Sequence, residues 1–448
     1  MATPTTPQAP SPHNGGDWLD SWTPEDPETW DSTLAWKSLW ITTFSLTLAF
    51  ITWFLVSALA PVLNNIGFSL STSQLYWLTA MPGLAGGGLR LVWMFLPPIM
   101  GTRRLVWMST VLFLIPLVGW GLAVQNPDTP FAVLLMLAIM AGVGGGVFSG
   151  FMPSTSYFFP KAKQGTALGV QAGIGNFGVS IVQFVTPWIV GFGLIGAAQV
   201  FTDPKTGETK DVWYQNAAWI WVPFVLVAIV LAFTMLRSVP VQARGLRQQT
   251  DIFSNKHTWI MTLMYVITFG TFSGLAASFG LLIKEYYGAD VFGAEAISPA
   301  QYAFYGALIG SAARVLAGPI ADRVGGGRVT LVAILGIAAC TAYSSFQLSP
   351  SSADDFARFF WGMMGIFFFT GVGNASTFKQ MPMIFKPRQA GGVIGWTAAI
   401  AAFGPFVFGL MFATGYTVAL FWLGVGVSLI GAAMCWHYYA RPGAEMPS

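Results

Sequence analysis

The stretch from Ser38 to Ala60 reads SLWITTFSLTLAFITWFLVSALA and contains no charged residue. A helix of about 20 apolar residues is long enough to cross the hydrocarbon core of a bilayer. The stretch is therefore predicted to be a membrane-spanning helix. Similar apolar runs follow along the whole chain and predict twelve spans, at residues 38–60, 74–96, 105–124, 130–156, 165–193, 215–236, 258–283, 298–320, 329–348, 357–384, 389–413 and 416–439.

The composition agrees with a membrane protein that crosses the bilayer many times. Only 9% of the 448 residues are charged, whereas soluble domains contain about 25%. So few charges could not cover the surface of a soluble protein of this size. The net charge of +3 without a dense basic stripe argues against a nucleic-acid partner. The predicted fold class is an all-α membrane protein in the lipid bilayer.

Lysine and arginine predict the orientation. If the N-terminus is inside, fourteen basic residues fall in inside segments and only four, Lys205, Lys210, Lys284 and Arg358, fall outside. This asymmetry follows the positive-inside rule and predicts two cytoplasmic termini in the cytoplasmic (inner) membrane. The inside set is Lys37, Arg103, Arg104, Lys161, Lys163, Arg237, Arg244, Arg247, Lys256, Arg323, Arg328, Lys386, Arg388 and Arg441.

The spans divide into two similar halves. Span four contains Gly142-Val-Gly and is followed by Phe159-Pro-Lys-Ala-Lys-Gln-Gly165, and span ten has the counterparts Gly371-Val-Gly and Phe385-Lys-Pro-Arg-Gln-Ala-Gly391. Two pseudo-symmetric six-helix halves are typical of secondary transporters. The predicted division is a polar cytoplasmic tail at 1–36, a first half at 37–236, a cytoplasmic linker at 237–257, a second half at 258–440 and a tail at 441–448.

Three basic residues, Arg90, Arg314 and Lys379, lie inside apolar runs, where ionisable groups are costly and indicate function. No acid lies deep in a span, so the interior is expected to hold positive charge without a protein partner. Arg90 and Arg314 occupy the equivalent spans two and eight. Two planar guanidinium groups facing each other would suit a planar oxyanion. The alternative is that both heads reach the cytoplasmic surface.

Lys379 is a candidate for proton coupling. A desolvated lysine can lose its proton, and two neighbouring arginines would favour that loss until an anion enters. The alternative is that Lys379 reaches the surface, since it lies only seven residues before Lys386.

Span five contains Gly173, Gly175 and Gly178 in a GxGxxG pattern. A dinucleotide site needs a preceding strand, so close helix packing is the better interpretation. Gln171 and Asn176 are then polar groups beside a cavity, or merely packing contacts. The two cysteines and three histidines form no cluster for a metal, and no metal or cofactor is expected.

Several stretches resemble known transporters. The loop Gly318-Pro-Ile-Ala-Asp322-Arg323-Val-Gly325-Gly-Gly-Arg328 resembles the conformational-switch loop of the major facilitator superfamily, although the first-half counterpart lacks the acid. The segments 22–27, 158–180 and 373–378 resemble the nitrate/nitrite porter family of that superfamily, NarK type.

The resemblance implies a major facilitator fold in which Arg90 and Arg314 hold nitrate or nitrite. It also implies that Tyr265 donates a hydroxyl group, that Phe148 and Phe269 form aromatic walls, and that Phe50 helps to seal the cavity. Gln171 stands where many members have Asn, and Lys379 replaces what is often a neutral residue. These departures favour coupling of nitrate to protons over nitrate/nitrite exchange.

The expected function is secondary active transport of nitrate, with nitrite and protons as further partners, by a monomer. Exchange without protons stays open as an alternative, and an anion channel with the same cationic filter is another. An enzyme is not expected, because the sequence has no paired carboxylates, no metal ligands and no pairing of a nucleophile with a base.

Overall fold

The computed structural model describes residues 16–28, 30–240 and 250–447. The first half forms six helical crossings: α1 (Ser32–Leu59), α2 (Thr72–Trp93), α3 with α4 (Pro97–Leu112 and Leu114–Ala123), α5 to α7 (Phe131–Ala141, Val143–Gly146 and Phe148–Ser156), α8 (Lys161–Ile189), and α9 with α10 (Asn216–Trp219 and Trp221–Met235). A 3-10 helix, η1 (Ala60–Ile66), follows α1.

The second half repeats this pattern. Its crossings are α12, η3 and α13 (Lys256–Tyr265, Val266–Gly270 and Thr271–Tyr287), α15 (Pro299–Val324), α16 (Gly326–Ser345), α17 (Phe356–Ile384), α18 with α19 (Pro387–Ala401 and Gly404–Ala413), and α20 with η6 (Thr417–Cys435 and Trp436–Ala440). Short helices lie in the connections: η2 (Thr250–Ser254), α14 (Ala289–Phe292), η4 (Gly293–Glu295) and η5 (Ala353–Asp355).

The twelve predicted crossings agree with these helices. Eleven helical stretches in the described part of the chain are long and apolar enough to cross a membrane. The twelfth, α2, has 22 residues and is less apolar because it carries Arg90 and a run of glycines. The all-α class is confirmed, with one addition: strands β1 (Gln199–Thr202) and β2 (Thr209–Val212) form an antiparallel hairpin after α8.

Two helices start well before the predicted residue. Helix α3 starts at Pro97 rather than at residue 105, because proline is well suited to the first turn of a helix. It is kinked at Gly101, whose φ of 72° suits glycine, and Arg103 and Arg104 follow on the helix. Helix α1 starts at Ser32 rather than at residue 38, because the Asp31 side chain accepts a hydrogen bond from the Leu34 amide and caps the helix.

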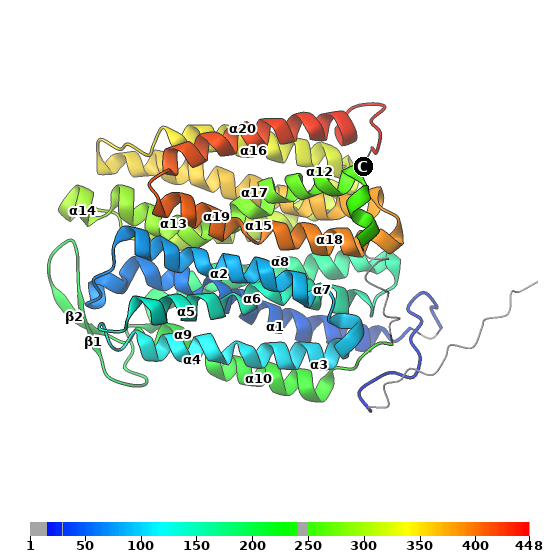
Figure 1. Cartoon of the computed structure of the whole chain (residues 1–448), viewed down its shortest axis with the longest axis horizontal. Helices are drawn as coiled ribbons and strands as arrows, with labels where there is room; N and C mark the ends of the chain where they lie inside the picture. Colours follow the sequence, from blue (N-terminus) through cyan, green and yellow to red (C-terminus); the bar gives the residue numbers. More distant parts are fainter. Residues whose placement is uncertain (1–15, 29, 241–249, 448) are drawn as a thin grey trace, which may run out of the picture.

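The two halves lie side by side with their helices roughly parallel (Figure 1). Helix α8 packs against α1 in its own half and against α15 in the other. Helix α2 packs against α18 and α19, and α13 packs against α1 and α2. The interface between the halves therefore runs the full length of the bundle. We call the end that carries β1 and β2 the hairpin end, and the opposite end, where residues 16–31 and 441–447 lie, the terminal end.

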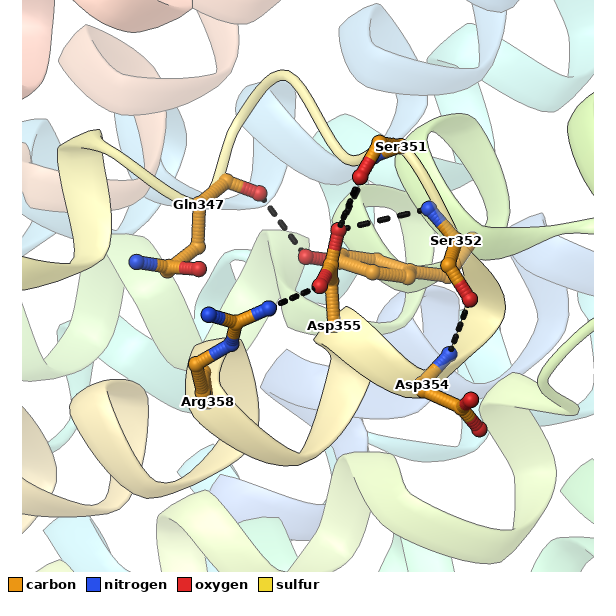
Figure 2. Close-up of polar contacts among 7 residues, drawn as sticks. Gln347, Ser351, Ser352, Asp354, Asp355 and Arg358 are labelled. Carbon is orange, nitrogen blue, oxygen red and sulfur yellow. Dashed lines mark hydrogen bonds and ion pairs between the residues drawn. The ribbon is translucent and has the colours of Figure 1, made fainter.

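The connection between α16 and α17 lies at the hairpin end and is held by one carboxylate (Figure 2). Asp355 accepts hydrogen bonds from the Ser351 amide at 2.9 Å and the Ser352 amide at 3.3 Å, and it forms an ion pair with Arg358. The Tyr287 hydroxyl donates to the Gln347 carbonyl at 2.8 Å. Arg358, predicted as an outside charge, thus stabilises a loop together with Asp355, far from the arginines of the interior.

The N-terminal tail is a packed part of the terminal end. The indole nitrogens of Trp22 and Trp30 donate to the carbonyls of Tyr157 and Phe158, at 3.0 and 2.9 Å. These contacts fasten the tail to the turn between α7 and α8. The predicted linker at 237–257 is described only in part, and Arg244 and Arg247 lie outside the described residues.

The C-terminal tail also folds back on the bundle. Glu445 lies 2.7 Å from the Lys256 ammonium and 3.3 Å from Nε2 of His257. Nδ1 of His257 lies 2.9 Å from the Tyr439 hydroxyl. The tail therefore joins the start of α12 to the end of the last crossing.

Candidate functional site

Arg90 is the centre of the candidate site. The side chain is fully buried on α2, with 0% exposure. Its Nε donates to the Gly145 carbonyl of α6 at 2.9 Å, and its Nη1 donates to the Ala398 carbonyl of α18 at 2.7 Å. Its Nη2 has no hydrogen-bond partner. The guanidinium therefore joins the two halves through its bond to Ala398 and keeps Nη2 free for a ligand.

Three aromatic rings surround the same guanidinium. The Cζ atom of Arg90 lies 4.6 Å from the ring centre of Phe148, and 5.3 Å from those of Phe269 and Trp53. Aromatic faces attract cations electrostatically, and the attraction is stronger away from water. The rings offset part of the cost of burying the charge.

Arg314 contributes the second cation, from α15. It is 5% exposed, its Nη1 has no hydrogen-bond partner, and its Cζ lies 5.1 Å from the ring centre of Phe378. The alternative in which both arginine heads reach the surface is wrong, because both side chains are buried. The Phe148 ring beside Arg90 lies 6.3 Å from the Phe378 ring beside Arg314, so both guanidiniums border one group of aromatic rings. In the part of the chain that the structure describes, neither forms an ion pair with an acid.

A π-helical turn places an aromatic pair at this position. Helix α12 ends at Tyr265 and continues through η3, Val266–Gly270, into α13. Such turns occur frequently at functional sites. The rings of Tyr265 and Phe269 are stacked at 5.4 Å with an interplanar angle of 5°. The Tyr265 hydroxyl is buried without a hydrogen-bond partner, and both arginines act on it electrostatically.

Three amides add further unused polar groups. Gln171 and Asn176 of α8 are buried, at 0% and 1% exposure, and none of their amide atoms has a hydrogen-bond partner. Asn374 of α17 is 1% exposed, and neither of its amide atoms has a hydrogen-bond partner. Buried amides without partners are rare in folded proteins and indicate missing ligands or waters. The three amides are therefore candidates for contact with a polar ligand.

The glycines of α8 serve helix packing, as predicted. A Cβ atom at Gly178 would lie 2.4 Å from the Thr47 carbonyl oxygen of α1, and one at Gly173 would lie 2.7 Å from Val315 of α15. These close approaches hold α8 against both halves and fix the positions of Gln171 and Asn176.

Phe50 packs against two of the rings that contact Arg90. Its ring centre is 6.2 Å from that of Phe148 and 5.5 Å from that of Trp53. Phe50 therefore supports the two rings that contact Arg90.

Lys379 requires a correction. The prediction that it has no acidic partner is wrong, because its ammonium forms an ion pair with the carboxylate of Asp322. The prediction treated Asp322 as part of a separate switch loop. The last turn of α15 instead brings that loop against α17, so Asp322 of the predicted switch loop forms an ion pair with Lys379, the predicted proton-coupling residue. The Lys379 side chain is 27% exposed and the Asp322 side chain 67% exposed, at the terminal end.

The remaining residues of the predicted switch loop surround this ion pair. Gly318 and Arg323 lie on the last turns of α15, Gly325 ends that helix with a φ of 102°, and Arg328 lies on the first turn of α16. The turn therefore joins α15 to α16 at the terminal end, on the side to which Lys379 also points.

Sequence reasoning missed three residues of the site: Trp53, Phe378 and Asn374. The Phe378 ring lies 5.0 Å from that of Tyr265 and 6.3 Å from that of Phe148, so it connects rings of both halves. Tryptophan in membrane helices is enriched at the water interface. The position of Trp53 well inside a span was the one available signal for it. No group of three metal-ligating side chains is found among the described residues.

Comparisons with known proteins place this sequence in a family. Residues 42–401 match the model of the Major Facilitator Superfamily. The "Probable nitrate/nitrite antiporter NarK2" of Thermus thermophilus is 60% identical over 441 residues, covering 96% of this chain and 98% of that protein. The "Nitrate/nitrite transporter NarU" of Escherichia coli is 37% identical over 372 residues, covering 82% of this chain and 79% of that protein.

Solved structures agree with the architecture. The D-xylose–proton symporter matches with a TM-score of 0.69, covering 90% of this chain and 97% of that one. At 15% sequence identity, this likeness concerns the fold alone.

Proposed function

The chain belongs to the major facilitator superfamily and, within it, to the nitrate/nitrite transporters, and from this premise we propose that it carries nitrate and nitrite across the membrane by alternating access. It is a membrane transporter and not an enzyme. The anion is held between Arg90 of the first half and Arg314 of the second. Tyr265 and the free amides of Gln171, Asn176 and Asn374 complete its polar contacts.

One observation carries the proposal: two buried guanidiniums, one from each half, each keep an unbonded N–H group and have no acidic partner in the described chain. Burial of an unpaired cation is costly, and a bound anion lowers that cost. A guanidinium offers two parallel donors to a planar oxyanion. The rings of Phe148 and Phe269, which both lie within 5.3 Å of the Arg90 guanidinium, would then lie beside the flat ion.

Exchange of nitrate for nitrite is the coupling that we propose. Without an anion, repulsion between the two guanidiniums opposes the approach of the two halves. With an anion, both cations are neutralised by one ligand that touches both halves, and the loaded protein can reorient. The proposal leaves Lys379 out of the coupling, because its ammonium is ion-paired with the carboxylate of Asp322.

The proposed topology follows the charge asymmetry. The basic residues predicted to lie inside gather at the terminal end wherever the structure describes them, and we propose that this end faces the cytoplasm. The hairpin end then faces outward. The chain acts as a monomer in the inner membrane, with its halves at 37–236 and 258–440 moving about the site.

Purified protein in liposomes tests both the substrate and the coupling. Labelled nitrate is added outside liposomes that contain nitrite, nitrate or neither anion, each with and without an inward proton gradient. We expect uptake only into liposomes that contain one of the anions, with no effect of the gradient. Uptake into anion-free liposomes driven by the proton gradient contradicts exchange and supports symport. Failure to move either anion contradicts the proposed function.

A further inference from the structure

We propose that Tyr76, Glu285 and Gln183 form the gate that closes the anion site toward the hairpin end. This inference rests on the proposed transport function, because a gate has meaning only for a site that opens alternately. The three residues lie near that end on α2, α13 and α8. They make three hydrogen bonds, of which two, Tyr76–Glu285 and Gln183–Ala276, cross from one half to the other.

The first bond joins Tyr76 to Glu285. The Tyr76 hydroxyl donates to Oε2 of Glu285 at 2.5 Å, although 209 residues separate the two in sequence. Tyr76 is fully buried, and Glu285 is half-buried on the last turn of α13. The Tyr76 ring also lies 5.4 Å from that of Phe412 on α19, in the second half. A short bond of this kind, shielded from water, holds the start of α2 against the end of α13.

Gln183 makes the second bond between the halves. Its Nε2 donates to the Ser57 hydroxyl of α1 and to the Ala276 carbonyl of α13, both at 2.9 Å. Ser57 belongs to the first half and Ala276 to the second. Gln183 is 4% exposed, and its Oε1 has no partner. One amide group thus connects three helices across the interface.

The helices between these bonds are in direct contact. A Cβ atom at Gly280, one turn beyond Ala276, would lie 3.0 Å from Cγ of Pro61. Only a glycine lets α13 approach the end of α1 this closely without displacing the proline. The contact holds α13 against the end of α1 between Ala276 and Glu285.

Two small cavities meet at Ser57, which accepts one of the hydrogen bonds of Gln183. One is lined by Gln183, Tyr214 and Pro299, and the other by Trp53, Thr79 and Pro82; Ser57 lines both. Trp53 is held by a 2.8 Å bond from its indole nitrogen to the Pro82 carbonyl and lies over Arg90. The first cavity therefore borders the proposed gate residue Gln183, and the second borders Trp53, which contacts Arg90.

Accessibility of the cavity lined by Trp53, Thr79 and Pro82 tests the gate directly. The reporter is Thr79→Cys in a background with Cys340→Ala and Cys435→Ser, because Thr79 is buried in that cavity and its hydroxyl bonds only within its own helix. A membrane-impermeant thiol reagent is added to intact cells and, separately, to inside-out vesicles, so that the side of access is measured. Tyr76→Phe, Glu285→Gln and Gln183→Leu are then introduced one at a time. Tyr416→Phe and Glu295→Gln, which change exposed residues at the same end, are the matched controls.

Loss of one bond across the interface is expected to speed modification from the hairpin side by about three- to tenfold. The control variants should react as slowly as the parent. Tyr76→Phe is nearly isosteric, so it keeps the test valid if Gln183→Leu fails to fold. Unchanged modification in both Tyr76→Phe and Glu285→Gln overturns the gate, as does an equal rise in the controls. Because the readout is chemical access, the gate can fail while nitrate exchange stands, or stand while the transported anion proves different.

Discussion

Replacing Arg90 by lysine keeps the charge of the site and removes its planar fork. In the structure, two donors of Arg90 are used by the Gly145 and Ala398 carbonyls and one is free. A lysine ammonium has three donors on one atom, so it cannot serve both carbonyls and an anion at their present positions. We expect the variant to lose at least one charge-assisted hydrogen bond to the anion, which contributes about 1.5–3 kcal/mol. This corresponds to about 10- to 150-fold weaker binding.

The assay is the half-saturating nitrate concentration for exchange in liposomes. The matched control is Arg103→Lys, because Arg103 also donates to a carbonyl, that of Phe233 at 2.6 Å, and lies 4.9 Å from the centre of that ring. Arg103 is partly exposed at the terminal end, so its replacement should change the half-saturating concentration by less than about twofold. Parental nitrate affinity in Arg90→Lys, or an equal loss in the control, would refute the assignment of Arg90 to the anion.

Three further predictions concern groups outside the arginine pair. Lys379→Gln and Asp322→Asn should each slow exchange without changing the half-saturating nitrate concentration, because both break the same ion pair. The charge swap Lys379→Asp with Asp322→Lys should restore the rate of exchange. Weaker nitrate affinity in Lys379→Gln alone would place the lysine at the anion. Trp30→Ala should lower the stability measured by thermal unfolding by about 1–3 kcal/mol, since it removes a hydrogen bond to the Phe158 carbonyl and half-buried ring contacts. The control is Trp188→Ala, at a 67% exposed position. An equal loss of stability in the control would contradict the role of the tail. The hydrogen bond from Lys256 lowers the pKa of Glu445. The stabilisation from this group is therefore complete above the unfolded pKa of about 4.3 and is lost as the pH falls through the lower folded value. The difference in Tm between the parent and Glu445→Gln should shrink on acidification to about pH 3, and a difference independent of pH would show that the contact does not titrate.

The sequence by itself determined the number of crossings, the division into two six-helix halves, and the presence of cations inside the bundle. Hydropathy and charge are local properties, so an apolar run reveals its span, and an arginine within it stands out, whatever the rest of the fold does. The packing role of Gly173 and Gly178 was also predictable, because glycines spaced along a membrane helix favour close helix contacts. The roles of Arg90, Arg314, Tyr265 and the amides as anion ligands stay predictions.

Only the tertiary structure decided which groups meet. The pairing of Lys379 with Asp322, the rings of Trp53 and Phe378 beside the guanidiniums, and the bond from Tyr76 to Glu285 all join residues from different helices. Such contacts depend on the rotation of each helix about its axis and on its depth beside its neighbours. Both are fixed by packing over the whole interface, and a single span carries little information about either.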